Sequence, residues 1–133
     1  MRSNKGFLSL WTFLFLAVTL HAEHVQWQGN YEKARLQALK AHKKLMVFLM
    51  EKECAECTEM LRTTFQDQKY IRQLNRAYVS VLVFRDQKRS YPIELLYTLE
   101  YPTLFFLDAQ EHYTRKALRG YTDAETLKAH LQK

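Results

Sequence analysis

The chain has only two cysteines, three glycines and two prolines among its 133 residues. So little glycine and proline leaves no room for a flexible low-complexity linker, and no internal repeat indicates a solenoid. A chain of this length favours one domain, and its 47% hydrophobic residues are enough for a compact core.

The chain also lacks a dense cluster of basic residues. Its formal net charge of +6 falls to +4 without Arg2 and Lys5, the charged residues of the first 22 positions. The other lysines and arginines lie among acidic residues along the whole chain, which is typical of solvated surface. A nucleic-acid partner is therefore not expected.

Cysteines are too few for a structural zinc site. Cys54 and Cys57 supply half of a tetrahedral site, and the five histidines show no second paired-ligand motif. We therefore expect no metal site and no bound cofactor. Copper carriage stays open as an alternative, because two soft thiolates suit Cu(I).

Residues 1–22 have the pattern of a secretory signal peptide. Arg2 and Lys5 form a positive n-region, and an uncharged apolar stretch over 7–20 precedes Ala22. Cleavage after Ala22 would leave residues 23–133 as the mature domain. The apolar stretch is shorter than the roughly 20 residues that a spanning helix needs, although a retained anchor is a second interpretation. We expect a periplasmic or secreted protein, in surroundings that permit disulfides.

The main feature of the remaining chain is a strand that leads into a dithiol. Six consecutive apolar residues from Leu45 to Met50 are too few for a globular helix and predict a strand covered on both faces. Cys54 and Cys57 follow, and residues 58–62 have helical character. Cys54 should therefore stand at a helix N-terminus with Cys57 one turn inside, where unpaired N–H groups and the helix dipole stabilise a thiolate.

The other elements alternate between helix and strand. The pattern predicts an edge strand over 25–27, a helix after Asn30 with an inner face of Tyr31, Ala34, Ala38 and Ala41, a helix capped by Asp67, a strand over 78–84, a helix over 91–99, a hairpin of strands 104–107 and 112–118, and a last helix capped by Thr122 or Asp123. Such alternation favours a parallel sheet with covering helices, and the hairpin makes that sheet mixed.

This order of features resembles the thioredoxin fold, and more narrowly the secreted thioredoxin-related proteins of bacteria. The resemblance runs from Trp27 to Leu131 and is carried by Trp27, Cys54-x-x-Cys57, Phe65, Asp67, Tyr101-Pro102-Thr103 and Gly120-Tyr121. It implies an α/β fold whose mixed central sheet has helices on both faces. It also implies that Pro102 is cis and that Tyr101, Pro102 and Thr103 form a substrate loop beside the cysteines.

The function implied by the resemblance is thiol:disulfide exchange. Cys54 would be the nucleophile and Cys57 the resolving thiol of a redox disulfide. The partners would be protein thiols or disulfides and a membrane-bound or soluble redox donor or acceptor, and we expect a monomer. The alternative is a non-catalytic thioredoxin-fold module that binds partner proteins or metal. An inert disulfide is less well supported, since a bridge across so short a loop restrains little chain entropy.

Two residues depart from the usual thioredoxin pattern. Glu53 stands where a tryptophan commonly precedes the first cysteine, and the strand 45–50 has no counterpart of the acid that thioredoxins bury there. The charges of Glu53 and Glu56 oppose a thiolate that the helix dipole favours. We expect these glutamates to make the dithiol a better electron donor, the alternative being that they are an ordinary solvated helix face.

Overall fold

The computed structural model describes residues 22–133, so the expected signal peptide lies outside the described residues except for Ala22. In the described part, the helices are α1 (Tyr31–Ala41), α2 (Ala55–Thr63), α3 (Gln68–Ala77) and α4 (Ala124–Gln132), and the strands are β1 (Lys44–Met50), β2 (Tyr78–Phe84), β3 (Thr103–Leu107) and β4 (Tyr113–Arg119). Among these residues, no helix is both long and apolar enough to cross a membrane.

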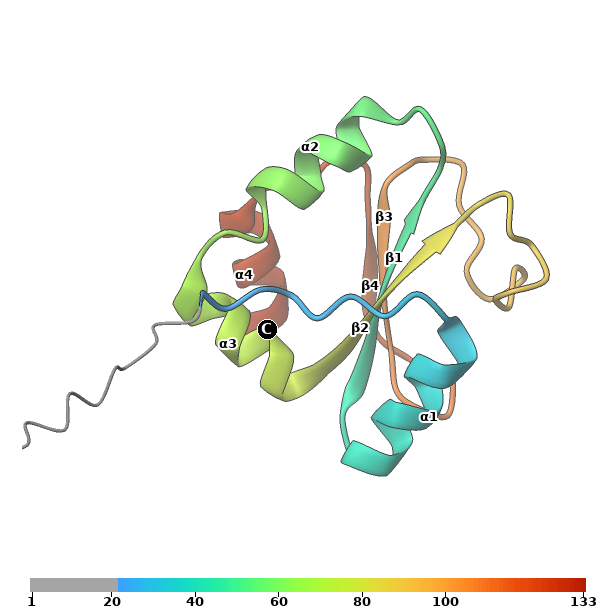
Figure 1. Ribbon diagram of the computed structural model, residues 1–133, viewed down its shortest axis with the longest axis horizontal. Coiled ribbons are helices and arrows are strands. Elements are labelled where there is room, and N and C mark those ends of the chain that lie inside the picture. Colours follow the sequence, from blue (N-terminus) through green and yellow to red (C-terminus); the bar gives the residue numbers. More distant parts are fainter. Residues whose placement is uncertain (1–21) are drawn as a thin grey trace, which may run out of the picture.

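The strands form one mixed sheet in the order β2-β1-β3-β4. β1 is parallel to β2 and antiparallel to β3, and β3 and β4 form an antiparallel hairpin. Helix α1 covers one face, and α2, α3 and α4 lie on the other (Figure 1). The predicted α/β fold with a mixed sheet and helices on both faces is therefore confirmed.

Alternate residues of β1 enter two separate cores. Leu45, Val47 and Leu49 point to the α1 side, whereas Met46 and Phe48 point to the side of α2, α3 and α4. All five are buried, because β1 is hydrogen-bonded on both edges and covered on both faces. The apolar run thus explains why β1 is the central strand that leads into the cysteines.

An aromatic cluster joins the segment before α1 to the second core. The Trp27 ring meets Phe48 and Phe65 edge-on, with ring centroids 5.6 Å and 5.2 Å apart. The strand expected over 25–27 is not formed. Gln28 makes an isolated parallel bridge to Val81 of β2 instead, so this segment lies along the β2 edge of the sheet.

Side-chain caps define where three helices begin. Asn30, Asp67 and Asp123 accept hydrogen bonds from the backbone N–H groups of the first turns of α1, α3 and α4. These predicted starts are confirmed, as is the break between α2 and α3. Ala41 was expected on the inner face of α1 but is exposed, because the helix ends there and His42 turns the chain in a left-handed conformation.

The prediction of a helix over 91–99 is wrong. Only one turn forms, in which the N–H groups of Leu95 and Leu96 both donate to the carbonyl of Pro92. The buried hydroxyl of Thr98 then accepts from the N–H of Glu100, which turns the backbone toward β3. A polar side chain that bonds nearby backbone competes with helix continuation, and here the competition ends the helix after one turn.

Candidate redox site

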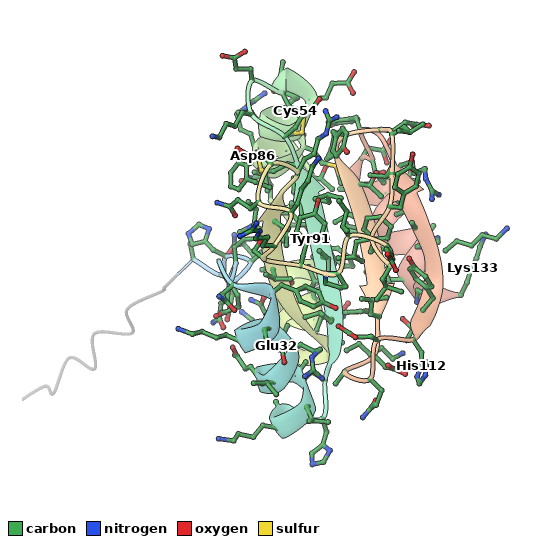
Figure 2. The ribbon with its side chains drawn as sticks, turned by 90° about the vertical axis from the view of Figure 1, so that its right-hand side faces the viewer. Glu32, Cys54, Asp86, Tyr91, His112 and Lys133 are labelled. Atoms are coloured by element: carbon green, nitrogen blue, oxygen red, sulfur yellow. A yellow bond between two sulfur atoms is a disulfide. The ribbon has the colours of Figure 1, made fainter. Side chains whose placement is uncertain are left out.

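Cys54 and Cys57 form a disulfide where β1 leads into α2. Glu53 turns the chain with a left-handed φ of 58°, and Cys54 is the N-cap of α2. Cys57 is fully buried, whereas Cys54 is partly exposed at the end of the molecule opposite Glu32 and His112 (Figure 2). The two sulfurs therefore differ in their access to a partner.

The first turn of α2 donates a hydrogen bond to the sulfur of Cys54, the less buried of the two cysteines. The N–H of Cys57 donates to the Sγ atom of Cys54 across 3.1 Å. Backbone donors at a helix N-terminus also favour negative charge through the helix dipole. The arrangement can therefore stabilise a thiolate on Cys54 when the disulfide is reduced.

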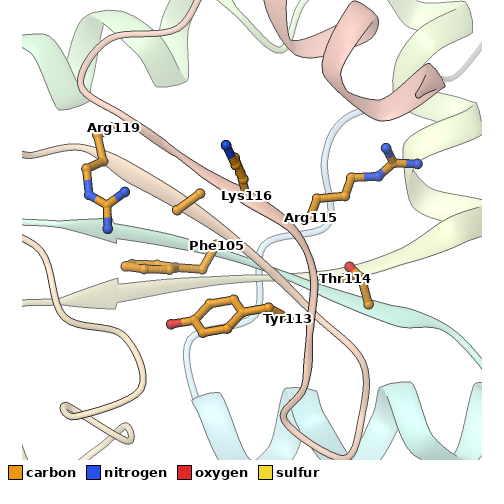
Figure 3. Close-up of a pocket in the computed structure, with 7 residues that line it drawn as sticks. Phe105, Tyr113, Thr114, Arg115, Lys116 and Arg119 are labelled. Carbon is orange, nitrogen blue, oxygen red and sulfur yellow. The ribbon is translucent and has the colours of Figure 1, made fainter.

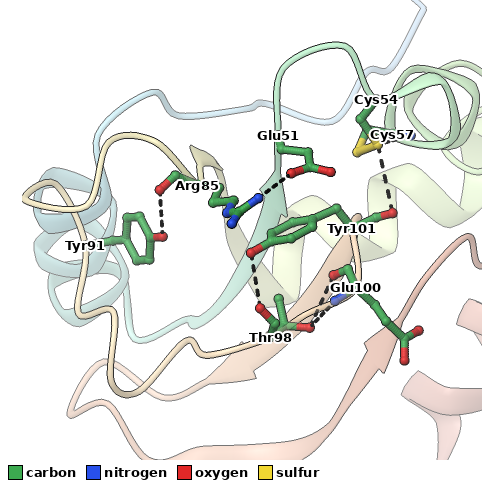
Figure 4. Close-up of polar contacts among 8 residues, drawn as sticks. All are labelled: Glu51, Cys54, Cys57, Arg85, Tyr91, Thr98, Glu100 and Tyr101. Carbon is green, nitrogen blue, oxygen red and sulfur yellow. Dashed lines mark hydrogen bonds and ion pairs between the residues drawn. A yellow bond between two sulfur atoms is a disulfide. The ribbon is translucent and has the colours of Figure 1, made fainter.

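The Tyr101–Pro102–Thr103 loop lies against this disulfide. The carbonyl oxygen of Tyr101 is 3.9 Å from the Sγ atom of Cys54, and the Tyr101–Pro102 peptide bond is cis (Figure 4). Thr103 is fully buried, and its hydroxyl donates to the carbonyl of Glu100. Tyr101 thus lies next to the sulfur of Cys54, and the buried Thr103 anchors the loop through its hydrogen bond to Glu100.

Arg85, the residue that follows β2, belongs to the site although no sequence motif had pointed to it. Its guanidinium pairs with Glu51 at 3.0 Å and lies over the Tyr101 ring, 5.5 Å from the centroid (Figure 4). The hydrogen bond with Glu51 raises the pKa of Arg85. One signal could have revealed it: parallel strands end at the same edge of a sheet, so the residue after β2 lies near those after β1.

Neutralised and free carboxylates surround the cysteines. Glu51 pairs with Arg85, and Glu59 pairs with Arg62 at 2.7 Å. Glu53 and Glu56 are exposed and form no ion pair within residues 22–133. The negative charge that remains beside Cys54 therefore comes from the two glutamates singled out in the sequence.

Among the described residues, no carboxylate is buried near Cys57. In the described part of the chain, the buried polar residues are Thr64, Ser80, Thr98, Thr103 and Thr122. No buried carboxylate is therefore available to exchange a proton with Cys57. Residues 22–133 also contain no group of three or more histidine, cysteine or acidic side chains placed to hold a metal ion.

An open hollow of about 430 Å³ adjoins Cys54, and Tyr101 is not among the residues that line it. Met50, Phe84 and Ala55 supply apolar walls, and Glu53 stands at its rim. The exposed sulfur thus has free space beside it into which a side chain of a partner can fit.

Comparisons with solved structures agree with this geometry. A thioredoxin from Thermus thermophilus superposes with a TM-score of 0.65 and 21% identity, over 81% of this chain and 86% of that chain. The oxidoreductase DsbH gives a TM-score of 0.61 and 20% identity, over 84% and 87%. A chain in the complex of ferredoxin:thioredoxin reductase with thioredoxin f2 gives 0.60 and 14%, over 84% and 94%. At these identities the likeness shows the shared fold.

The sequence itself carries the family assignment. No curated protein matches the chain significantly. Residues 31–133 match the family described as a thioredoxin-like domain, and this match includes both cysteines and the Tyr101–Pro102–Thr103 loop. The chain therefore belongs to the thioredoxin-like domain family.

Proposed function

We propose that this protein is an exported thiol:disulfide oxidoreductase that exchanges disulfides with partner proteins through Cys54 and Cys57. One observation carries the proposal: the thioredoxin-like domain holds a disulfide at the start of α2, with one sulfur accessible and the other buried. That asymmetry suits a nucleophile and a resolving thiol.

In the reducing direction, the Cys54 thiolate attacks one sulfur of a partner disulfide. An S–S bond forms between Cys54 and the partner while the partner's own S–S bond breaks, and the departing thiolate takes a proton from solvent. The Cys57 thiolate then attacks the Sγ atom of Cys54 and releases the second partner sulfur. Two electrons pass to the partner, and the Cys54–Cys57 disulfide remains. The reverse sequence oxidises a partner dithiol.

The free carboxylates support the reducing direction. Glu53 and Glu56 place uncompensated negative charge beside the sulfur that must become an anion. A less stable thiolate destabilises the reduced form and so makes the dithiol a stronger donor of electrons.

Export and protein partners complete the proposal. The signal-peptide pattern of residues 1–22 supports a periplasmic or secreted location, where disulfide chemistry is available. A structural neighbour occurs in a complex with ferredoxin:thioredoxin reductase, which supports a protein as the redox donor or acceptor here.

Reduction of insulin with dithiothreitol as the electron donor tests this function. The native chain should precipitate insulin faster than dithiothreitol alone, and Cys54→Ser should return the rate to that background. Serine is a good N-cap, so the variant removes the sulfur while it keeps the start of α2. A native chain that gives only the background rate would instead be a binding module without turnover.

A further inference from the structure

The surface of β4 near the redox site has features that disulfide exchange alone does not require. An open hollow of about 710 Å³ lies on β4, with Phe105 and Tyr113 forming an aromatic wall (Figure 3). Its other lining residues are the cations Arg115, Lys116 and Arg119 together with Thr114 and Ala117, and no carboxylate of the described residues contributes to it. The hollow is therefore aromatic on one side and basic on its rim.

Two of the three basic residues, Lys116 and Arg119, are free to meet an anionic partner. Lys116 and Arg119 are exposed, and neither they nor Arg115 form an ion pair within residues 22–133. Arg115 reaches toward α4, where its Nη1 donates to the carbonyl of His130, and its Nε is buried without a partner. Arg119 points toward the aromatic wall (Figure 3).

Exposed apolar side chains also occur on the segment between Leu95, which contacts Tyr113, and Tyr101, which borders Cys54. The Tyr113 hydroxyl donates to the carbonyl of Leu95, so the chain segment that carries Tyr97 and Leu99 lies beside β4. Tyr97 is 63% exposed and Leu99 is 81% exposed. Large apolar side chains so exposed on one short segment commonly mark a surface for a partner protein.

β4 also connects directly to the redox loop. The N–H of Gly120, the residue after β4, donates to the carbonyl of Pro102 across 2.8 Å. Arg119 pairs with Thr103 across the β3–β4 ladder, and Tyr101 borders Cys54. A molecule held at Arg119 would therefore lie next to the loop that faces the exposed sulfur.

We infer that this surface, defined by Tyr113, Lys116, Arg119, Tyr97 and Leu99, recruits the redox partner by binding an acidic segment that carries aromatic or apolar residues. The inference rests on the proposed function, because that function makes the occupant a protein. Charge complementarity selects acidic side chains, and the aromatic wall accepts the apolar ones. A second copy docked through the same face is a poor occupant, since it would set equal positive charges against each other.

Two mixed-disulfide peptides test the inference. Each carries one cysteine bonded to 5-thio-2-nitrobenzoate, a Gly-Ser spacer that keeps the tail away from Glu53 and Glu56, and a tail of alternating phenylalanine with either glutamate or lysine. The reduced native protein should release the coloured thiol from the acidic peptide about tenfold faster at 10 mM salt. The preference should vanish at 1 M salt, where screening shortens to about 3 Å.

Paired variants locate the effect. Lys116→Glu/Arg119→Glu should abolish or reverse the preference, and Lys116→Gln/Arg119→Gln should reduce it while adding no new charge. Lys69→Glu/Arg76→Glu on α3, which packs beside β2 at the other edge of the sheet, is the matched control and should leave the preference intact. The readout is a ratio of rates, so a general change in Cys54 reactivity cancels.

The outcomes separate this inference from the proposed function. Equal rates for both peptides, or an acidic preference that survives Lys116→Glu/Arg119→Glu, would overturn the recruitment surface and leave the exchange activity standing. Release from neither peptide would overturn the proposed function itself. Two further results would also overturn the inference: a native dimer in sedimentation that these substitutions dissociate, or binding to phosphatidylglycerol vesicles that they abolish without any peptide preference.

Discussion

The Sγ atom of Cys54 lies 3.9 Å from the carbonyl oxygen of Tyr101, although 47 positions separate the two residues in the chain. The Arg85 guanidinium lies over the ring of the same tyrosine and pairs with Glu51 just before the cysteines. Three distant segments are thus joined by side-chain contacts around one sulfur.

The difference in burial predicts a division of labour between the sulfurs. With Cys57→Ala, the exposed Cys54 can still attack a partner disulfide, but no second thiol resolves the product. Cys57→Ala should therefore accumulate mixed disulfides in extracts, visible as bands on a non-reducing gel that dithiothreitol removes. Cys54→Ala should accumulate none, because the remaining thiol is buried; equal trapping by both variants would contradict the assignment.

Removal of the free carboxylates should change the redox balance. Glu53→Gln/Glu56→Gln takes away two charges that oppose a thiolate on Cys54. Alkylation of the reduced protein by iodoacetamide should then reach its half-maximal rate at a lower pH, and the glutathione equilibrium should shift toward the dithiol. Both shifts should shrink between 10 mM salt, where the screening length is about 30 Å, and 1 M, where it is about 3 Å.

Glu59→Gln is the control for this pair. Glu59 belongs to the same helix but is neutralised by Arg62 at 2.7 Å. Its replacement should leave the pH of half-maximal alkylation of Cys54 unchanged. If the double variant also behaves like the native chain at low salt, Glu53 and Glu56 are an ordinary hydrated surface and the argument for a reducing role fails.

Arg85 should act as a positioning residue for the Tyr101 loop. Arg85→Met removes the pair with Glu51 and the cation over the Tyr101 ring, so the loop beside Cys54 should become less ordered. We expect insulin reduction to fall about threefold with little change in melting temperature, since Arg85 is exposed. Arg85→Lys keeps a charge for Glu51 and should recover part of the rate. A native rate in Arg85→Met would show that the loop holds its place without Arg85.

The buried, hydrogen-bonded hydroxyl of Tyr31 leads us to expect that the protein loses stability at high pH. Its hydroxyl donates to Glu111 across 2.9 Å, and burial together with this bond raises the pKa of Tyr31. The folded pKa lies above the unfolded value of about 10, so the contribution is complete below that pH and is lost as the pH rises further. Urea unfolding between pH 9 and 11.5 should show a shallower decline for Tyr31→Phe than for the native chain.

At neutral pH the same substitution should cost about 1.5 kcal/mol, because one hydrogen bond to a charged acceptor is lost. Tyr70→Phe offers a contrast. Burial raises the pKa of Tyr70 as well, but its hydroxyl is buried without a partner. Tyr70→Phe should therefore flatten the high-pH decline without a loss of stability at neutral pH, and a comparable loss in both variants would argue against the role given to the Tyr31–Glu111 bond.

Local signals in the sequence were sufficient for much of the fold. The apolar run from Leu45 to Met50 predicted the central strand, and capping side chains such as Asp67 predicted helix starts, because each signal acts within a few residues. The helix expected over 91–99 failed for a reason that spacing does not show. Thr98 is buried and bonds the backbone of Glu100, so a tertiary position of one hydroxyl overrides a local helical pattern.

The candidate site was predictable in part for the same reason. Adjacent residues such as Glu53 and Cys54 are neighbours in any fold, so their relation could be stated from the sequence. The contacts of Arg85 with Glu51 and Tyr101 depend on β1 being parallel to β2 and antiparallel to β3. The alternation of helix and strand already favoured the parallel pairing, which places Arg85 near Glu51. The contact of Arg85 with Tyr101 depends in addition on packing across the whole sheet, and no short motif encodes it.

The reduction potential of the Cys54–Cys57 pair tests the central claim most directly, namely that this disulfide is reversibly reduced and that the resulting dithiol donates electrons. It can be measured by equilibrating the protein in glutathione or dithiothreitol buffers and counting free thiols by mass after alkylation. We predict a reversible two-electron transition between about −200 and −300 mV. A potential near −120 mV, which is typical of a strong oxidant, would contradict the reducing direction. A bond that stays oxidised well below −300 mV would contradict the exchange function altogether.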